Sequence, residues 1–116
     1  MALTFHRVWG TIRRVEEPVA YRALVEQLLD DPRVSETQMM GMPALKLGGK
    51  LFGGRAGDDL VLRVGRERAA ELIGAGRGSA FDPSGRDRPM KDWVVLAEPA
   101  DDWHALALEA QKQLDS

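Results

Sequence analysis

The segment Ala44-Leu45-Lys46-Leu47-Gly48-Gly49-Lys50-Leu51-Phe52 carries the strongest structural signal in the chain. Two runs rich in apolar residues flank a pair of glycines. Glycine adopts the positive φ angles of a two-residue hairpin turn without strain. The segment therefore predicts two antiparallel strands joined at Gly48-Gly49.

Beyond this hairpin, the chain keeps the two-residue period of strands. Gly57-Asp58-Asp59 indicates another turn, and Leu60, Leu62 and Val64 after it alternate onto one face. Residues 36–65 are therefore predicted to form three or four antiparallel strands.

Helical periods precede and follow these strands. Residues 17–30 predict a helix with Pro18 at its first position, and Asp31-Pro32 ends it. Residues 66–74 predict a second helix, and residues 75–91 are rich in turn formers. The side chains of these two helices that we expect to face the core are Tyr21, Leu24, Val25, Leu28, Ala69, Leu72 and Ile73.

The C-terminal part predicts a strand at Trp93-Val94-Val95-Leu96 and a last helix with Asp101 as its N-cap. The apolar stripe of that helix is Trp103, Leu106, Ala107, Ala110 and Leu114. Successive antiparallel strands, with helices that each bury one stripe, predict an α+β fold. The expected architecture is a two-layer sandwich of one antiparallel sheet packed with helices.

Residues 1–16 precede this pattern. Phe5, Val8, Trp9 and Ile12 have helical spacing, but Gly10 interrupts it. We expect an N-terminal extension at 1–16, either a further helix or an arm, followed by one domain at 17–116.

The composition excludes several classes of protein. The chain has 116 residues, no cysteine and a net charge of −2. Without cysteine there is no disulfide, no thiolate nucleophile and no cysteine-based zinc site. No signal peptide and no apolar run of membrane-helix length is visible in the sequence, so we expect a cytoplasmic protein without a membrane partner.

Three groups of residues resemble the TfoX (Sxy) N-terminal domain family, over about residues 18–115. They are Gln38-Met39-Met40-Gly41, then the hairpin from Lys46 to Gly53 with Leu60 to Gly65, then Arg88-Pro89-Met90-Lys91-Asp92-Trp93. The segment from Gly41 to Lys46 is also similar to the YjbR-like family. The resemblance implies the order α-β-β-β-α-β-β-α, as in secretion-chaperone-like folds. It also implies a bacterial cytoplasmic protein linked to the regulation of competence or transcription, and it supplies no catalytic residue.

Catalytic and metal-binding patterns are weak. Asp101 and His104 could share a helix face, but two ligands are too few for a metal site. Gly48-Gly49-Lys50 is followed by Leu51 and lies in a hairpin, unlike a phosphate-binding loop. We therefore predict no enzyme activity, no metal and no cofactor.

Methionine and tryptophan side chains are candidates for contacts with partners. Met39, Met40 and Met42 form an adaptable apolar cluster, in which strand alternation points one of Met39 and Met40 inward and the other outward. Trp9 is the candidate contact of a homodimer, because tryptophan is enriched at binding hot spots.

Basic residues are concentrated between positions 63 and 91. Arg63, Arg88 and Lys91 in this stretch are the candidate residues for an anion or an acidic partner, because arginine makes directional contacts with phosphate and carboxylate. The alternative is an ordinary charged surface with local pairing between arginine and aspartate.

The leading hypothesis is a non-enzymatic, TfoX-like regulatory or adaptor module that acts through protein–protein contacts. An exposed strand edge or the segment from Met39 to Pro43 would supply the surface. The first alternative is a nucleic-acid-binding protein that uses residues 63–91. The second is a small-ligand-binding protein or an enzyme of unknown type, with a pocket between sheet and helices lined by Lys50, Arg63 or Lys91.

Overall fold

The computed structural model describes residues 17–115, so the predicted extension at 1–16, with Trp9, lies outside the described residues. The helices are α2 (Val19–Leu28), α3 (Arg66–Gly74) and α4 (Trp103–Asp115). The strands are β1 (Val34–Met39), β2 (Met42–Leu47), β3 (Lys50–Ala56), β4 (Asp59–Arg63), β5 (Ser79–Ala80) and β6 (Trp93–Leu96). The predicted α+β class is confirmed. The resemblance implied three strands between the first two helices, and the structure has four, the larger number that the strand pattern allowed.

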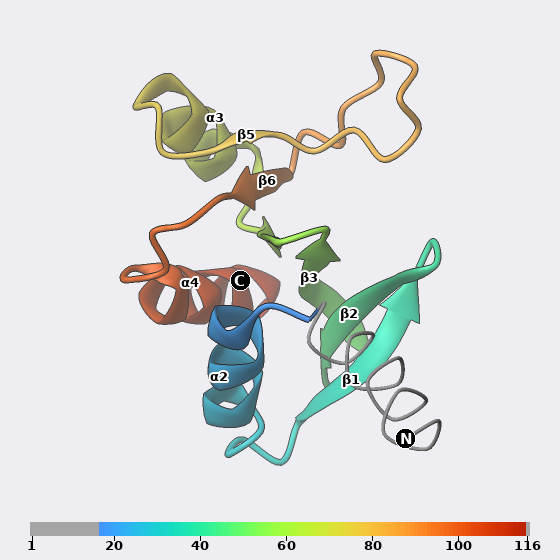
Figure 1. Ribbon diagram of the computed structural model, residues 1–116, viewed down its shortest axis with the longest axis vertical. Coiled ribbons are helices and arrows are strands. Elements are labelled where there is room, and N and C mark those ends of the chain that lie inside the picture. The colour runs from blue at the N-terminus through green and yellow to red at the C-terminus, as the bar shows by residue number, and fades with distance from the viewer. Residues whose placement is uncertain (1–16, 116) are drawn as a thin grey trace, which may run out of the picture.

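The six described strands form one antiparallel sheet in the order β1-β2-β3-β4-β6-β5 (Figure 1). The predicted hairpin joins β2 to β3, and Gly48 and Gly49 take φ angles of 56° and 90°. Leu45 pairs with Gly53 and Lys46 with Leu51, so Phe52 is one extra residue on β3. This bulge bends the strand locally and leaves the Phe52 side chain fully buried in the core.

Helices cover one face of the sheet. Successive strand residues point to opposite faces, and Leu45, Leu60 and Leu62 point to the helices, where none of them is exposed. They pack with the apolar stripes of α2 and α4, and each such leucine stabilises the fold by about 1.5–3 kcal/mol. In Figure 1, α2 and α4 lie close together, whereas α3 lies beside β5 and β6.

The opposite face carries a second, smaller apolar cluster. Its buried members are Met39, Ala44, Val61, Phe81 and Trp93. The Phe81 ring comes from the loop between β5 and β6 and lies 5.9 Å from the Trp93 ring, centroid to centroid. Met90, near the end of the same loop, also packs against this cluster. The loop therefore covers part of the sheet face that the helices do not.

The β5–β6 loop is closed by its own hydrogen bonds. The Asp82 carboxylate accepts hydrogen bonds from the Ser84 hydroxyl at 2.7 Å and from the backbone N–H groups of Gly85 at 3.2 Å and Arg88 at 3.0 Å. These donors, the Ser84 hydroxyl first, lower the pKa of the Asp82 carboxyl. The Met90 N–H donates to the Phe81 carbonyl at 2.8 Å. The loop thereby returns to the sheet at Lys91 and Asp92.

Two helix starts differ from the prediction. Pro18 is the N-cap of α2, not its first helical residue, because its ψ of 137° is extended. Asp101 is exposed and is not the N-cap of α4. The Leu106 N–H donates to the Asp102 carbonyl at 3.0 Å, so the N-cap position belongs to Asp102.

Side chains of the predicted stripes are buried with two exceptions. Ile73 is 40% exposed, because only Ala69 and Leu72 of α3 face the core. Leu114 is half-buried near the end of α4 and packs against the edge of the main cluster. In the part of the chain that the structure describes, no helix has the length and apolar character needed to cross a membrane.

Candidate binding groove

A groove with a volume of about 1200 Å³ lies on the sheet face opposite the helices. Its described basic residues are Lys46, Lys50, Arg63, Arg66 and Lys91. Its apolar residues are Met39, Leu51, Met90 and Trp93, with Pro89 beside them, and its one described carboxylate is Asp92. We name these residues the basic groove.

Strand alternation positions two of the cations. Lys46 of β2 has the same parity as Ala44, and Arg63 of β4 has the same parity as Val61. Ala44 and Val61 both belong to the second apolar cluster, so Lys46 and Arg63 point to the same face of the sheet. Lys50 joins them from the first position of β3, directly after the turn.

The remaining cations come from the junction of β4, α3 and the β5–β6 loop. The Val64 and Gly65 N–H groups both donate to the Asp92 carbonyl at 3.0 Å. These two bonds fasten the start of α3 to the end of the loop. They bring Arg66, the first residue of α3, to the same groove as Lys91.

The groove is strongly positive on a molecule of net charge −2. Its five described cations meet one carboxylate, which leaves a local charge of +4. Arg63 Nη2 lies 3.9 Å from Asp92 Oδ2, a long ion pair between half-exposed side chains. Among residues 17–115, Lys46, Lys50, Arg66 and Lys91 form no ion pair. The groove therefore offers uncompensated positive charge to an anion.

The floor of the groove is apolar but contributes little exposed aromatic surface. Trp93 is only 6% exposed because Phe81 packs against it. Met39 is 8% exposed, and Leu51 and Met90 are half-buried. Methionine side chains are flexible, so such a floor can adapt to aliphatic groups of a ligand.

A second hollow of about 520 Å³ adjoins the basic groove. Lys50, Arg63, Arg66 and Asp92 line both spaces. Gly65 forms part of its wall with a φ of 93°, and a Cβ there would lie 3.0 Å from the Gln113 amide. These residues mark the junction between the two spaces.

The residues predicted for partner binding are only partly brought together. Met39, Arg63 and Lys91 line the basic groove. Met40 is 58% exposed at the β1–β2 turn, so the predicted inward and outward split of Met39 and Met40 is confirmed. Met42 packs against the second apolar cluster.

Arg88 is exposed on the β5–β6 loop and does not line the groove. Lys46, by contrast, was not among the candidate residues. The signal that points to it is its parity with Ala44 in an alternating strand. Arg66 lies within the basic stretch at 63–91, but no pattern in the sequence places it in the same groove as Lys50.

Two other arginines of the basic stretch have a structural role, because they connect α3 and the segment after it to α4 and the residues before it. Arg68 donates to Glu109 of α4 at 3.1 Å and to Glu71 at 3.4 Å. Arg77 donates to Asp102 at 2.6 Å and to the carbonyls of Ala97 and Pro99. The basic stretch therefore divides into groove residues and structural residues.

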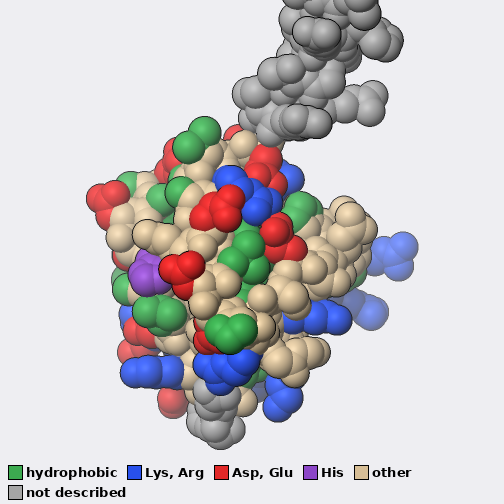
Figure 2. Space-filling view, turned by 90° about the horizontal axis from the view of Figure 1, so that it is seen from below, with side chains coloured by type: hydrophobic (Ala, Val, Ile, Leu, Met, Phe, Trp, Pro, Cys, Tyr) green, Lys and Arg blue, Asp and Glu red, His purple; other side chains and the backbone are tan. Residues whose placement is uncertain are grey.

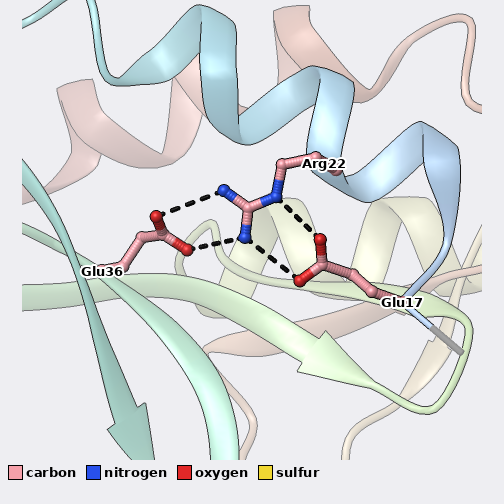
Figure 3. A network of polar contacts seen from close by, with 3 residues as sticks. All are labelled: Glu17, Arg22 and Glu36. Carbon is pink, nitrogen blue, oxygen red and sulfur yellow. Dashed lines mark hydrogen bonds and ion pairs between the residues drawn. The ribbon is translucent and has the colours of Figure 1, made fainter. Parts of the chain in front are cut away.

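Arg22 belongs to a separate polar cluster between α2 and β1 (Figure 3). Its guanidinium donates to both Glu17 oxygens, at 2.7 and 3.1 Å, and to both Glu36 oxygens, at 2.9 and 3.2 Å. These bonds lower the pKa of the Glu17 carboxyl. Because two carboxylates already occupy the guanidinium, we assign this cluster to joining α2 to β1.

Figure 2 shows the molecule from below, at right angles to the view of Figure 1. Acidic and basic side chains lie next to one another across that face, with apolar side chains scattered between them. Asp101 and His104, the metal candidates, are both exposed. Within residues 17–115, no group of three or more histidine or carboxylate side chains could hold a metal ion.

No protein-family model, no curated protein and no solved structure matches this chain. The resemblance to the TfoX N-terminal domain therefore stays a prediction. The geometry of the basic groove carries the functional argument.

Proposed function

We propose that the chain is a non-enzymatic adaptor module of the TfoX-like kind that binds an acidic segment of a partner protein in the basic groove. The observation that carries this proposal is the gathering of five cations around an apolar floor on a chain of net charge −2. Charge complementarity steers association and selects partners.

The character of the floor favours a protein segment over nucleic acid. Single strands bind to sheets largely by stacking bases on exposed aromatic rings. Phe81 and Trp93 are 3% and 6% exposed, and they pack against each other instead. Aliphatic side chains of a peptide fit the space over Met39, Leu51 and Met90 without a stacking surface.

The second candidate function is the binding of a small anionic ligand. The observation that favours it is that Lys50, Arg63 and Lys91 line one hollow, as that alternative required. The hollow lies on the open sheet face, however, and not between the sheet and the helices. An open groove suits an extended segment better than an enclosed small molecule.

The test is affinity co-purification from native extract, run in parallel with and without nuclease, using the double variant Arg63→Glu/Lys91→Glu beside the wild type. The matched control is Arg86→Glu, an exposed arginine on the same loop that does not line the groove. We expect a stoichiometric protein that the double variant loses and the control retains. Cross-linking should place its contact in an acidic segment.

Purified partner and chain should also dissociate more readily at high salt, because the Debye length shrinks from about 10 Å at 0.1 M to about 3 Å at 1 M. Retention of the partner by the double variant would contradict the proposal. Material that is recovered only without nuclease would favour the nucleic-acid alternative instead.

A further inference from the structure

The residues shared by the two hollows, which we call the junction, carry more positive charge than a single carboxylate of a ligand could neutralise. Lys50, Arg63 and Arg66 line both spaces, and Asp92 is the one described carboxylate that does so. Three cations against one carboxylate leave a charge of +2 at this point. The nearest approach of Asp92 to Arg63 is 3.9 Å, too long for a hydrogen bond.

The charge of the junction fits a dianion. A phosphoryl group on a side chain carries about −1.5 to −2 at neutral pH, whereas a glutamate carries one charge. Its three terminal oxygens can accept hydrogen bonds from the forked N–H groups of two arginines and from the ammonium group of a lysine. A carboxylate would leave one of these cations uncompensated.

The shape of the site places such a group at one end of a longer ligand. The second hollow, of about 520 Å³, shares the three cations and Asp92 with the groove of about 1200 Å³. The apolar floor begins at Leu51, directly after Lys50 in the chain. A segment with aliphatic side chains over the floor can therefore direct one charged side chain into the junction.

We propose that Lys50, Arg63 and Arg66 form a subsite for a phosphoryl group carried by the partner segment that docks in the basic groove. This inference rests on the proposed function. Arg68 and Arg77 of the same basic stretch do not take part, because their guanidinium groups are bound to Glu109 and Asp102.

The test compares fluorescent acidic peptides of alternating glutamate and leucine that differ at one central position, which is phosphoserine, glutamate or serine. Fluorescence anisotropy with the full chain should give about tenfold tighter binding of the phosphoserine peptide than of the glutamate peptide, the equivalent of one charge-assisted hydrogen bond. Amide NMR shifts should place the phosphoserine effect at Lys50, Arg63 and Arg66.

The matched variants are Lys50→Gln and Lys46→Gln. Lys50 lines both hollows, and Lys46 lines only the larger one. Lys50→Gln and Arg66→Gln should abolish the preference for phosphoserine. Lys46→Gln should weaken all three peptides by a similar factor and keep the preference.

Several results would overturn the inference. Equal binding of the phosphoserine and glutamate peptides would refute the subsite and leave the proposed function standing. Binding of none of the three peptides would count against both. A single-stranded oligonucleotide that displaces the phosphoserine peptide and binds more tightly at the same residues would replace the phosphorylated segment with nucleic acid.

Discussion

Tyr21 lies on the buried face of α2 and is the only tyrosine in the chain. Burial, with the nearby Glu36 carboxylate second, raises its pKa to about 12. The Arg55 guanidinium lies 5.7 Å from the centre of the ring and partly opposes this shift. The folded protein therefore holds the phenol proton more tightly than the unfolded chain does.

The raised pKa of Tyr21 predicts that the free energy of unfolding falls at alkaline pH. An unfolded tyrosine titrates near pH 10, so the contribution of Tyr21 to stability is complete below about pH 10 and is lost as the pH rises to about 12. The tyrosinate absorbance of the native protein should have its midpoint near 12, and that of the urea-unfolded chain near 10. The variant Tyr21→Phe has no tyrosine and gives the background absorbance to subtract. A native midpoint near 10 would show that the ring is not buried as described.

Gly54 is a second residue at which the packing allows little change. A Cβ at this position would lie 2.6 Å from the Pro43 carbonyl oxygen on the neighbouring strand. Backbone cannot move as a flexible side chain can, so Gly54→Ala should lower the free energy of unfolding by about 1–3 kcal/mol.

The control is Gly74→Ala at the end of α3, where a Cβ would meet nothing within 4 Å. That change should be neutral or raise the free energy of unfolding by up to about 1 kcal/mol, because alanine favours helix more than glycine does. Urea denaturation measures both variants. Equal effects at the two positions would contradict the close approach of β2 and β3 at Gly54.

At the scale of elements, Arg77 joins the segment after α3 to the start of α4. Its hydrogen bonds hold the pKa of the Asp102 carboxyl below its ordinary value, against a smaller opposing effect of burial. An aspartate with a lowered folded pKa contributes stability above its unfolded value of about 3.9 and loses it as the pH falls through the folded value.

Asp102→Asn should therefore lower the free energy of unfolding by about 1 kcal/mol at neutral pH. The value is modest because the Asp102 side chain is 42% exposed. The difference from wild type should shrink as the pH falls below about 4. Urea denaturation of both proteins across a pH series measures this difference in the free energy of unfolding. Asp101→Asn, one residue earlier and exposed, is the control and should change little. A pH-independent difference would rule out the ion pair as the source.

The two faces of the sheet also show what local sequence can predict. The strand pattern predicted which residues alternate, and Leu60, Leu62 and Val64 are all buried in the main core. The bounds predicted for the helix at 66–74 and the strand at 93–96 agree with the structure. Glycine turns and apolar periods are properties of neighbouring residues, so they can be read without the fold.

At the scale of the whole molecule, the paired charges and the unpaired cations lie in different places. Acidic side chains pair with arginines in the clusters around Arg22, Arg68 and Arg77. The groove cations, apart from the long contact of Arg63 with Asp92, form no ion pair among the described residues. An acidic chain can thus present a basic surface, which its net charge does not reveal.

The homodimer expected from the sequence is a further prediction, with Trp9 as its contact. Light scattering should give the mass of two chains for the wild type and of one chain for Trp9→Ala, because tryptophan anchors often dominate interface energy. The basic groove variant Lys46→Gln serves as a control that should remain dimeric. An unchanged mass for Trp9→Ala would remove Trp9 from the proposed interface.

The amino-acid sequence was sufficient for the fold class, the β2–β3 hairpin, most of the helix and strand positions and the expectation that one of Met39 and Met40 is buried and the other exposed. These depend on contacts between residues close in the chain and on the conformations that glycine allows. The tertiary structure was needed for the basic groove, because β2, β4, α3 and the β5–β6 loop bring Lys46 and Lys91 to one face from distant positions. Both faces of the sheet carry apolar residues, and only the placement of all three described helices on one of them leaves the other accessible.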